Sequence, residues 1–290
     1  MAIQTVTVTI NGETYNLTNT SGNTWTATLT APGKTSFNMS GGKYPVTVKA
    51  TNTAGTVTTD ATYGLQVKET IAPVITITSP TGGALVTNNK QPIVFTITDE
   101  SGGSGVNLSS LVVKQDGTAV ASSTIKSTAI TNGYSVTYTP ASALSDGSHT
   151  VAITCSDNDG NAATAKSTTY TVDTVPPTLN VTSPANGSIT SNQSCVVAGT
   201  TNDSTSSPVT LTVNGSAVTV GSNGAFSTTV TLKEGSNTIT VVATDAAGKT
   251  TTVTRTVTLD TSAPVISSVS IAPNPANTGA SMVITVVVTG

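Results

Sequence analysis

The chain has 290 residues, enough for two to four small domains, and 36% of them are hydrophobic, so it can build cores. Only 9% are charged, the net charge is −3, and Arg255 is the only arginine, which excludes the basic surface that nucleic-acid binding requires. No run approaches the length of a transmembrane helix. The abundant Thr and Val favour pleated strands over helices, so the composition predicts an all-β protein.

The N-terminal sequence and the cysteines indicate where the protein folds. The first residues, MAIQTVTVTI, contain neither a basic segment nor an uninterrupted apolar segment, so no secretory signal peptide is predicted. We therefore expect the protein to act where it is made, or to leave the cell by lysis or inside a particle. Cys155 and Cys195 are the only cysteines and lie in different predicted domains. Two buried free thiols are expected, as suits folding in a reducing cytoplasm.

Three landmarks recur in a fixed order along the chain, which predicts tandem repeats. The first landmark is a strand that begins next to a proline, here called the opening proline (Pro73, Pro177 or Pro264). Proline at the margin of a strand suits an edge position, because proline has no backbone N–H to donate. The three segments are APVITITSPTGG (72–83), PPTLNVTSPANG (176–187) and APVISSVSIAPNP (263–275).

The second landmark is a pair of strands joined by Asn-Gly or Asp-Gly. This dipeptide between alternating runs predicts a β-hairpin with a type I′ turn, which needs positive φ at both central residues. The hairpins are VTINGETYNL (8–17), VVKQDGTAVA (112–121) and LTVNGSAVTV (211–220). One aromatic residue follows each hairpin, and we expect the three to occupy equivalent core positions: Trp25, Tyr134 and Phe226.

The third landmark is a strand followed by an Asx turn that contains glycine, in VKATNTAG (48–55), ITCSDNDG (153–160) and VVATDAAG (241–248). The landmarks delimit two whole repeats, 71–174 and 175–262. Each is about 100 residues long with short strands and frequent turns, which predicts immunoglobulin-like β-sandwiches. The proline-containing junctions between them predict stiff linkers, so we expect a semi-rigid rod.

The two chain ends carry incomplete units. Gly117 follows Pro73 by 44 residues, whereas Gly12 has only 11 residues before it. Residues 1–70 thus lack about two strands and predict a reduced Ig-like unit for attachment. Residues 263–290 predict a two-strand partial unit that contains the strands missing from 1–70.

Three interpretations of these ends remain open. In the first, each end attaches to other proteins of a particle, through residues 1–70 and 263–290. In the second, residues 263–290 of one copy complete residues 1–70 of the next, which gives a head-to-tail homo-oligomer. In the third, the chain is cut at both ends. A host-surface receptor is a further expected partner, because loops at the ends of sandwiches often bind partners. Nucleic acid and membrane are not expected as partners.

No catalytic constellation is visible, so the chain is not expected to be an enzyme. His149 is the only histidine; no nucleophile motif accompanies it, and we expect a surface residue at the start of a strand. One histidine and two distant cysteines cannot supply four zinc ligands. Nucleotide-binding glycine motifs are absent.

One acidic turn is a candidate metal site. SDNDGN (156–161) places Asp157, Asp159 and Asn161 at alternating positions, and Asp173 lies at the next junction. Hard oxygen ligands of this kind suit Ca²⁺, which would stiffen the joint between the two whole repeats. The alternative is an ordinary Asx turn, because the equivalent turns at 51–56 and 244–249 lack the second acid. No other cofactor is predicted.

The junctions at 173–177 and 260–264, with the pattern D-T-x-x-P, and the segment VVATDAAGKTTTVTRTVTLDTSAP (241–264) resemble bacterial immunoglobulin-like (Big-type) tandem repeats. The resemblance is close over about 70–290 and looser over 1–70. It implies a non-enzymatic structural or appendage protein, such as the multi-repeat proteins of phage and prophage tails, located in a virion or phage-like particle. A bacterial cell-surface adhesin or stalk fragment is the alternative.

Overall fold

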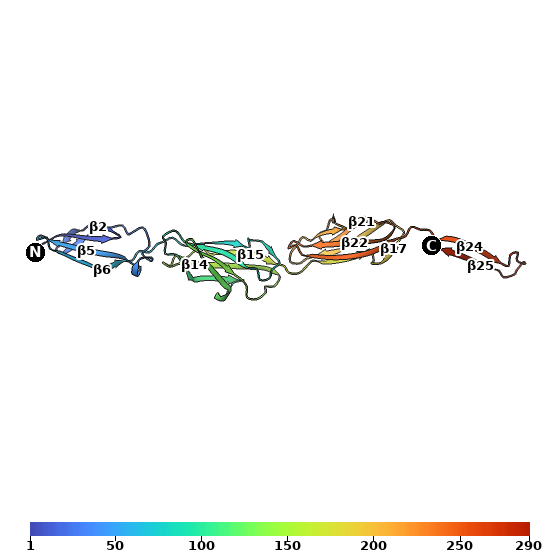
Figure 1. Ribbon diagram of the computed structural model, residues 1–290, viewed down its shortest axis with the longest axis horizontal. Helices are drawn as coiled ribbons and strands as arrows, with labels where there is room; N and C mark the ends of the chain where they lie inside the picture. The colour runs from blue at the N-terminus through green and yellow to red at the C-terminus, as the bar shows by residue number, and fades with distance from the viewer. The chain divides into compact units, whose positions relative to one another are not determined.

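The computed structural model describes all 290 residues as strands, turns and two short 3-10 segments, η1 (Ser40–Gly42) and η2 (Ser122–Thr124). No helix is long and apolar enough to cross a membrane. The chain divides into two compact units, Met1–Val172 and Asp173–Gly290. Tandem Ig-like β-sandwiches are confirmed as the fold, and Figure 1 labels some of the strands named below.

Residues 1–70 form one open sheet, here called the first sheet, with strand order β2-β1-β5-β6. Between β2 and β5 in the sequence lies a separate small hairpin, β3–β4, which is not part of this sheet. The alternation of Thr and Val along β1 explains why this segment is a strand with one apolar face. The strands are β1 (Ile3–Ile10), β2 (Glu13–Asn16), β3 (Thr18–Ser21), β4 (Thr24–Thr26), β5 (Tyr44–Asn52) and β6 (Val57–Leu65).

The apolar face of the first sheet is covered only in part. Val6 pairs with Ala50, Val8 with Val48 and Ile10 with Val46, so these side chains share one face. Of the six, only Val6 is buried, at 9% exposure, and the others are half-buried. The opposite face carries polar residues, such as the half-buried Thr7 and its exposed partner Lys49.

Residues 71–172 form a closed sandwich, here called repeat two, with a five-stranded sheet in the order β11-β10-β14-β15-β8 and a four-stranded sheet in the order β12-β13-β9-β7. Both sheets contribute to one core, which includes Ile93, Phe95, Val113, Val151 and Tyr170. The strands are β7 (Val74–Ser79), β8 (Leu85–Val86), β9 (Ile93–Thr98), β10 (Val106–Gln115), β11 (Thr118–Ala119), β12 (Ile125–Ile130), β13 (Gly133–Tyr138), β14 (Gly147–Asp157) and β15 (Lys166–Val172).

Residues 173–262 form a second closed sandwich, repeat three, with a three-stranded sheet β16-β18-β21 and a five-stranded sheet β17-β23-β22-β19-β20. Its core joins both sheets and includes Val197, Leu211, Phe226, Ile239 and Val241. The strands are β16 (Thr178–Ser183), β17 (Ser188–Thr190), β18 (Ser194–Asn202), β19 (Thr210–Val213), β20 (Ser216–Val218), β21 (Ala225–Thr231), β22 (Gly235–Thr244) and β23 (Thr250–Leu259).

The last segment is a two-stranded antiparallel pair, here called the C-terminal hairpin, made of β24 (Val265–Ala272) and β25 (Val283–Thr289). Every residue of both strands is exposed. The register pairs Ile266 with Val288, Val269 with Val286, and Ile271 with Ile284, which places six apolar side chains on one face. Unlike repeats two and three, neither the first sheet nor the C-terminal hairpin is part of a closed sandwich.

The predicted hairpin turns have the expected backbone. The first turn residue, Asn11, Asp116 or Asn214, has φ between 49° and 51°, and each following glycine has φ of 81°. Positive φ at both positions is the requirement of a type I′ turn, and glycine meets it without a Cβ clash. Tyr134 and Phe226 occupy equivalent strands, β13 and β21, whereas Trp25 lies on β4 of the separate hairpin. Of the three, only Phe226 is buried, and Trp25 and Tyr134 are half-buried, so the expectation of three equivalent core positions was wrong for Trp25.

Candidate functional site

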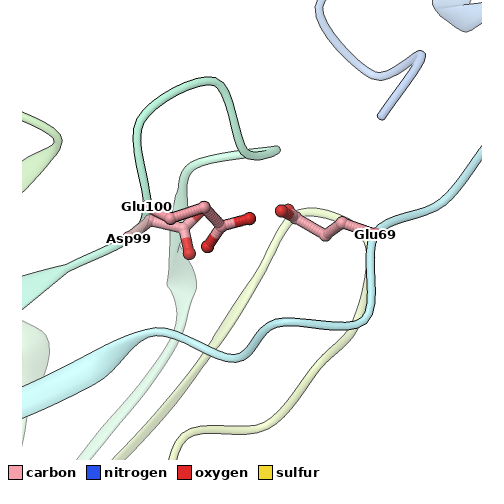
Figure 2. A group of neighbouring side chains, drawn as sticks. All are labelled: Glu69, Asp99 and Glu100. Carbon is pink, nitrogen blue, oxygen red and sulfur yellow. The ribbon is translucent and has the colours of Figure 1, made fainter. Parts of the chain in front are cut away.

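Three carboxylates meet where the first sheet leads into repeat two. Glu69 lies between β6 and the opening Pro73, and Asp99 and Glu100 follow β9 directly. One oxygen from each of the three lies within 4.8 Å of the others. Figure 2 shows the three side chains facing one another across a small space. We call this group the first acidic cluster.

Backbone amides orient two of these carboxylates. Ser104 N–H donates to Glu69 Oε1 at 2.5 Å, and Gly105 N–H donates to Asp99 Oδ2 at 2.7 Å. Glu69 Oε2, Asp99 Oδ1 and Glu100 Oε2 are buried and receive no hydrogen bond from any donor. A buried carboxylate oxygen without a donor is costly, so three in one place need a compensating positive charge or proton.

Gly103 leaves the space that the three carboxylates face. A Cβ at this position would lie 2.7 Å from Glu100 Oε1, 2.7 Å from Glu69 Oε2 and 2.8 Å from Asp99 Oδ2. Any side chain at Gly103 would therefore collide with all three groups. The glycine is required here for space and not for backbone freedom, since its φ lies outside the positive region.

Repulsion within the cluster changes the protonation of one member. Two carboxylates separated by 4.8 Å repel each other by roughly 3 kcal/mol at the effective dielectric of a protein surface. A proton shared with the Glu69 carboxyl, then burial, and then the neighbouring Asp99 carboxyl raise the pKa of Glu100 to about 7. Below about pH 7, the cluster therefore retains a proton that an ordinary glutamate would release.

A second acidic cluster lies in repeat three and consists of Asp173, Asp203 and Asp245, again with one oxygen of each within 4.8 Å. Asp173 is fully buried and Asp245 is 5% exposed. Val175 N–H and the Ser206 hydroxyl donate to Asp173, and Lys249 N–H donates to Asp245 Oδ1 at 2.8 Å. Asp245 Oδ2 is buried and has no donor.

The residues predicted from the SDNDGN turn do not all meet. Asp157 caps its own turn, accepting from Gly160 N–H at 2.6 Å and Asn161 N–H at 2.8 Å. Asp159 Oδ2 accepts from the Thr35 hydroxyl and from Glu69 N–H, and the Asn161 amide donates to Glu69 O at 3.1 Å. The turn therefore fastens the end of the first sheet to repeat two.

Asp173 does not join that turn. Asp157 ends β14, while Val172, next to Asp173, pairs with Gly147 at the other end of the same strand. The ten residue-to-residue steps from Gly147 to Asp157 separate the two ends by roughly 33 Å at the rise of an antiparallel strand. Asp157, Asp159, Asn161 and Asp173 thus do not form one site, and Asp173 belongs to the second acidic cluster instead.

His149 is buried at 8% exposure, so the expectation of a surface residue was wrong. The ring bonds to Asp116 Oδ2 through Nδ1 at 2.7 Å and to Ser145 O through Nε2 at 2.8 Å. Burial lowers the pKa of His149, but the hydrogen bonds with Asp116 and Ser145 and the Asp116 charge outweigh it, so the pKa is raised overall. The histidine joins a hairpin turn to the next strand, which is a structural role.

Both cysteines are buried and unpaired, as predicted. Burial is the main cause that raises the thiol pKa of Cys155 and of Cys195. Since the thiolate is the reactive form, both groups are poor nucleophiles at neutral pH.

The sequence contained a signal for the acidic clusters that the local turn pattern did not reveal. Glu69, Asp173 and Asp260 each lie four residues before an opening proline. Asp99 follows β9 and Asp203 follows β18, and each of these strands pairs with the opening strand of its repeat, β7 or β16. Acidic residues that stand at equivalent positions in different repeats therefore locate both clusters. The spacing of acidic residues within a single turn does not locate them.

Comparisons with known proteins agree with the fold of the two closed sandwiches. Residues 72–174 match the family described as a bacterial Ig-like domain, and residues 177–261 match the family described as glucodextranase, domain B. Bacillopeptidase F of Bacillus subtilis (strain 168) is 32% identical over 124 residues, which is 43% of this chain. The chain spans only 8% of the length of that relative.

Solved structures similar to the chain also consist of tandem modules. The fibronectin(III)-like modules of CbhA from Clostridium thermocellum are 20% identical with a TM-score of 0.36, covering 64% of this chain and 94% of that chain. The titin I-band fragment I67–I69 is 15% identical with a TM-score of 0.46, covering 89% of this chain and 88% of that chain. The chain is a tandem protein of Ig-like domains, one of which, at 72–174, matches the bacterial Ig-like family.

Proposed function

We propose that this chain is a non-catalytic structural protein of a phage or phage-like tail particle. The two closed sandwiches act as a spacer, and two uncovered apolar faces act as attachment surfaces. Tandem Ig-like sandwiches are typical of structural and adhesive roles, while fold alone does not fix the function. The observation that carries the proposal is the apolar face of the C-terminal hairpin.

That face is unusually apolar for an exposed surface. Its six side chains are Ile266, Val269, Ile271, Ile284, Val286 and Val288, and their exposure lies between 43% and 63%. Neither strand contains a charged residue. Contiguous apolar patches of this kind in soluble proteins are typical of interaction sites, because water contact with them is unfavourable.

The first sheet offers a matching surface. In repeat two, the sheet that contains β10, β14 and β15 is covered by the sheet that contains β7 and β9. The first sheet has the strands equivalent to β10, β14 and β15, namely β1, β5 and β6, and its apolar face is only half-buried. The pair β24–β25 is antiparallel and starts beside an opening proline, as β7–β9 does.

We therefore propose that each apolar face binds a second copy of the chain. The C-terminal hairpin of one copy packs on the first sheet of another. The contact is heterologous, so repetition gives rings or filaments. Such an assembly suits a spacer in a particle built from many copies.

The test is the oligomeric state of the full chain by analytical ultracentrifugation over a range of concentrations. We expect concentration-dependent oligomers for the unaltered chain and a monomer for the double variant Val269→Asp/Val286→Asp. The matched control is Ser270→Asp/Thr285→Asp, which puts the same charges on the paired residues of the opposite hairpin face and should still assemble. A chain that stays monomeric at every concentration would refute the head-to-tail contact.

The particle setting rests on the resemblance of the whole chain to multi-repeat proteins of phage and prophage tails, and it has its own test. Antibody labelling of tails on purified particles would support it. Labelling of intact, uninfected bacterial cells would instead favour the alternative, a cell-surface adhesin or stalk, with a host-surface receptor as its partner.

A further inference from the structure

We propose that the first acidic cluster, Glu69, Asp99 and Glu100, binds a calcium ion, and that the second acidic cluster, Asp173, Asp203 and Asp245, binds another. This inference is independent of the proposed spacer function. It assigns the ions to residues other than the set that the SDNDGN turn suggests.

The first argument is the lack of a positive partner. None of the six carboxylates forms an ion pair with a lysine or arginine, since the structure's one ion pair joins His149 to Asp116. In the first cluster each carboxylate has one buried oxygen without a donor, and Asp99 is only 8% exposed. In the second cluster the same holds for Asp245 Oδ2, at 5% exposure. Buried charges without a partner call for a ligand of opposite charge.

The second argument is convergence on one space. The Gly103 contacts place Glu69 Oε2, Glu100 Oε1 and Asp99 Oδ2 within 2.8 Å of a single point. Calcium–oxygen distances are about 2.3–2.6 Å, so a small shift of these side chains around an ion beside that point gives bonding distances. The amides of Ser104 and Gly105 already hold two of the carboxylates in place, as groups outside the ligand shell do in metal sites.

The ligand chemistry selects calcium among common ions. All donors are carboxylate oxygens, which excludes the nitrogen and sulfur ligands that zinc prefers. Calcium accepts irregular sets of six to eight oxygens, with water completing the shell, whereas magnesium requires near-octahedral geometry. Three carboxylates from two chain segments in the first cluster, and from three segments in the second, suit the more tolerant ion.

The third argument is recurrence at equivalent places. Each cluster combines an acid four residues before an opening proline (Glu69 or Asp173) with an acid just after the strand that pairs with the opening strand of the repeat (Asp99 after β9, or Asp203 after β18). Two repeats of different sequence thus place two of the three acids at equivalent positions, while the third differs: Glu100 follows Asp99 directly, and Asp245 follows β22. Crowding of like charges by chance would not be expected to repeat in register.

A bound ion would fix the segment that enters each repeat. In the first cluster it would tie Glu69, which follows the first sheet, to the loop after β9. In the second it would tie Asp173 to the loops after β18 and β22. Calcium is then expected to reduce motion at the start of both whole repeats.

Lys34 is the competing source of positive charge. Its side chain lies beside Gly102, where a Cβ would stand 3.6 Å from Lys34 Nζ. If this lysine neutralises the first cluster, calcium has nothing to compensate there. The variant Lys34→Met separates the two explanations: calcium should bind the first cluster in both the unaltered chain and the variant, whereas binding at that site in the variant alone would assign the neutralising role to Lys34.

The test is isothermal titration calorimetry of the full chain with calcium chloride, after treatment with EGTA. We expect two saturable sites, with magnesium chloride binding more weakly. Asp99→Asn/Glu100→Gln should remove one site and Asp203→Asn/Asp245→Asn the other. Each single amide substitution should weaken its site by about tenfold or more, the loss typical even for groups outside the ligand shell. Asp60→Asn, an exposed acid on β6, is the matched control and should keep both sites.

Misfolding cannot mimic this result, because each variant removes charge from a crowded cluster and should raise the melting temperature in EGTA. The unaltered chain should gain thermal stability from calcium, and the variants should not. Absence of saturable calcium binding to the unaltered chain would overturn the proposal. Retention of both sites in either double variant would overturn the assignment to these residues, and equal affinity for magnesium would overturn the choice of calcium.

Discussion

The first sheet and repeat two are built from the same parts and differ in what covers them. Both have a type I′ hairpin, the same order of central strands and a closing Asx turn. Repeat two adds a second sheet, and its core residues Val151 and Ile153 are fully buried. The equivalent residues of the first sheet, Val46 and Val48, are only half-buried. Strand formation is therefore a local property, whereas burial depends on a second sheet.

The largest effect in this comparison should come from the core of the closed sandwich. Phe95 is fully buried between the two sheets of repeat two. Phe95→Ala removes a large side chain from a packed core and should cost about 3–5 kcal/mol of unfolding free energy. Hydrogen exchange of the amides of β9 and β14 measures this loss of unfolding free energy. A loss below about 1 kcal/mol would mean that repeat two is as open as the first sheet.

A matched pair of valines sharpens the comparison directly. Val151 and Val46 each lie six residues before the Asx residue of their closing turn, Asp157 or Asn52. Val151→Ala should cost about 2 kcal/mol, because it deletes fully buried methyl groups, and Val46→Ala about half as much or less. Hydrogen exchange of β14 and β5 reports the two values. Equal losses would show that the face of the first sheet is covered in solution, as head-to-tail assembly predicts at high concentration.

The turns should not distinguish the two regions. Gly12 and Gly117 both have φ of 81°, and nothing lies within 4 Å of a Cβ at either position. Gly12→Ala and Gly117→Ala should therefore each cost about 1 kcal/mol, from backbone strain alone. Exchange of the flanking strands measures this cost. A clearly larger loss at one turn would point to a contact with a neighbouring molecule there.

The smallest effect concerns pH and belongs to repeat two alone. Burial raises the pKa of Asp116, but hydrogen bonds with His149, Thr150 and Gln115 outweigh it, so the pKa lies below 3.8. The raised His149 pKa gives stability that is complete below 6.5 and lost as pH rises through the folded pKa. The lowered Asp116 pKa gives stability that is lost as pH falls below 3.8.

The ion pair therefore stabilises repeat two most between pH 3.8 and 6.5. Asp116→Asn should lower the stability by less than about 1 kcal/mol in that window, and by less still above it. The substitution keeps the backbone bond, because Asn214 of repeat three accepts from Thr240 N–H at 2.8 Å just as Asp116 accepts from Thr150 N–H. Urea denaturation at pH 5.5 and 8.5 tests it, and a loss that grows with pH would contradict the assignment.

Much of the fold could be predicted from the sequence because the signals are local. Asn-Gly and Asp-Gly turns, alternating strands and prolines at strand margins each act over a few residues, and their order defines the repeats. The burial of His149 could not be predicted in this way. It depends on Asp116, which is 33 residues away in sequence and reaches the ring only once β10 and β14 pair.

The acidic clusters show the same limit. Asp157, Asp159 and Asn161 share a turn, and the sequence suggested a shared ion on that ground. In the structure their oxygens and amide serve hydrogen bonds within the turn and to Glu69 and Thr35. The carboxylates that do converge come from segments about 30 residues apart or more, and only tertiary structure brings Glu69 to Asp99, or Asp173 to Asp203.

The parallel pairing of β8 with β15, and of β17 with β23, has a mechanical consequence. In each repeat a short strand near the start of the domain lies parallel to the last strand. Tension applied along the chain pulls these strands in opposite directions, so their hydrogen bonds are loaded together in shear and do not open one after another. The register joins two residue pairs in repeat two and three pairs in repeat three. Under load, repeat two should therefore yield first and repeat three should hold longer.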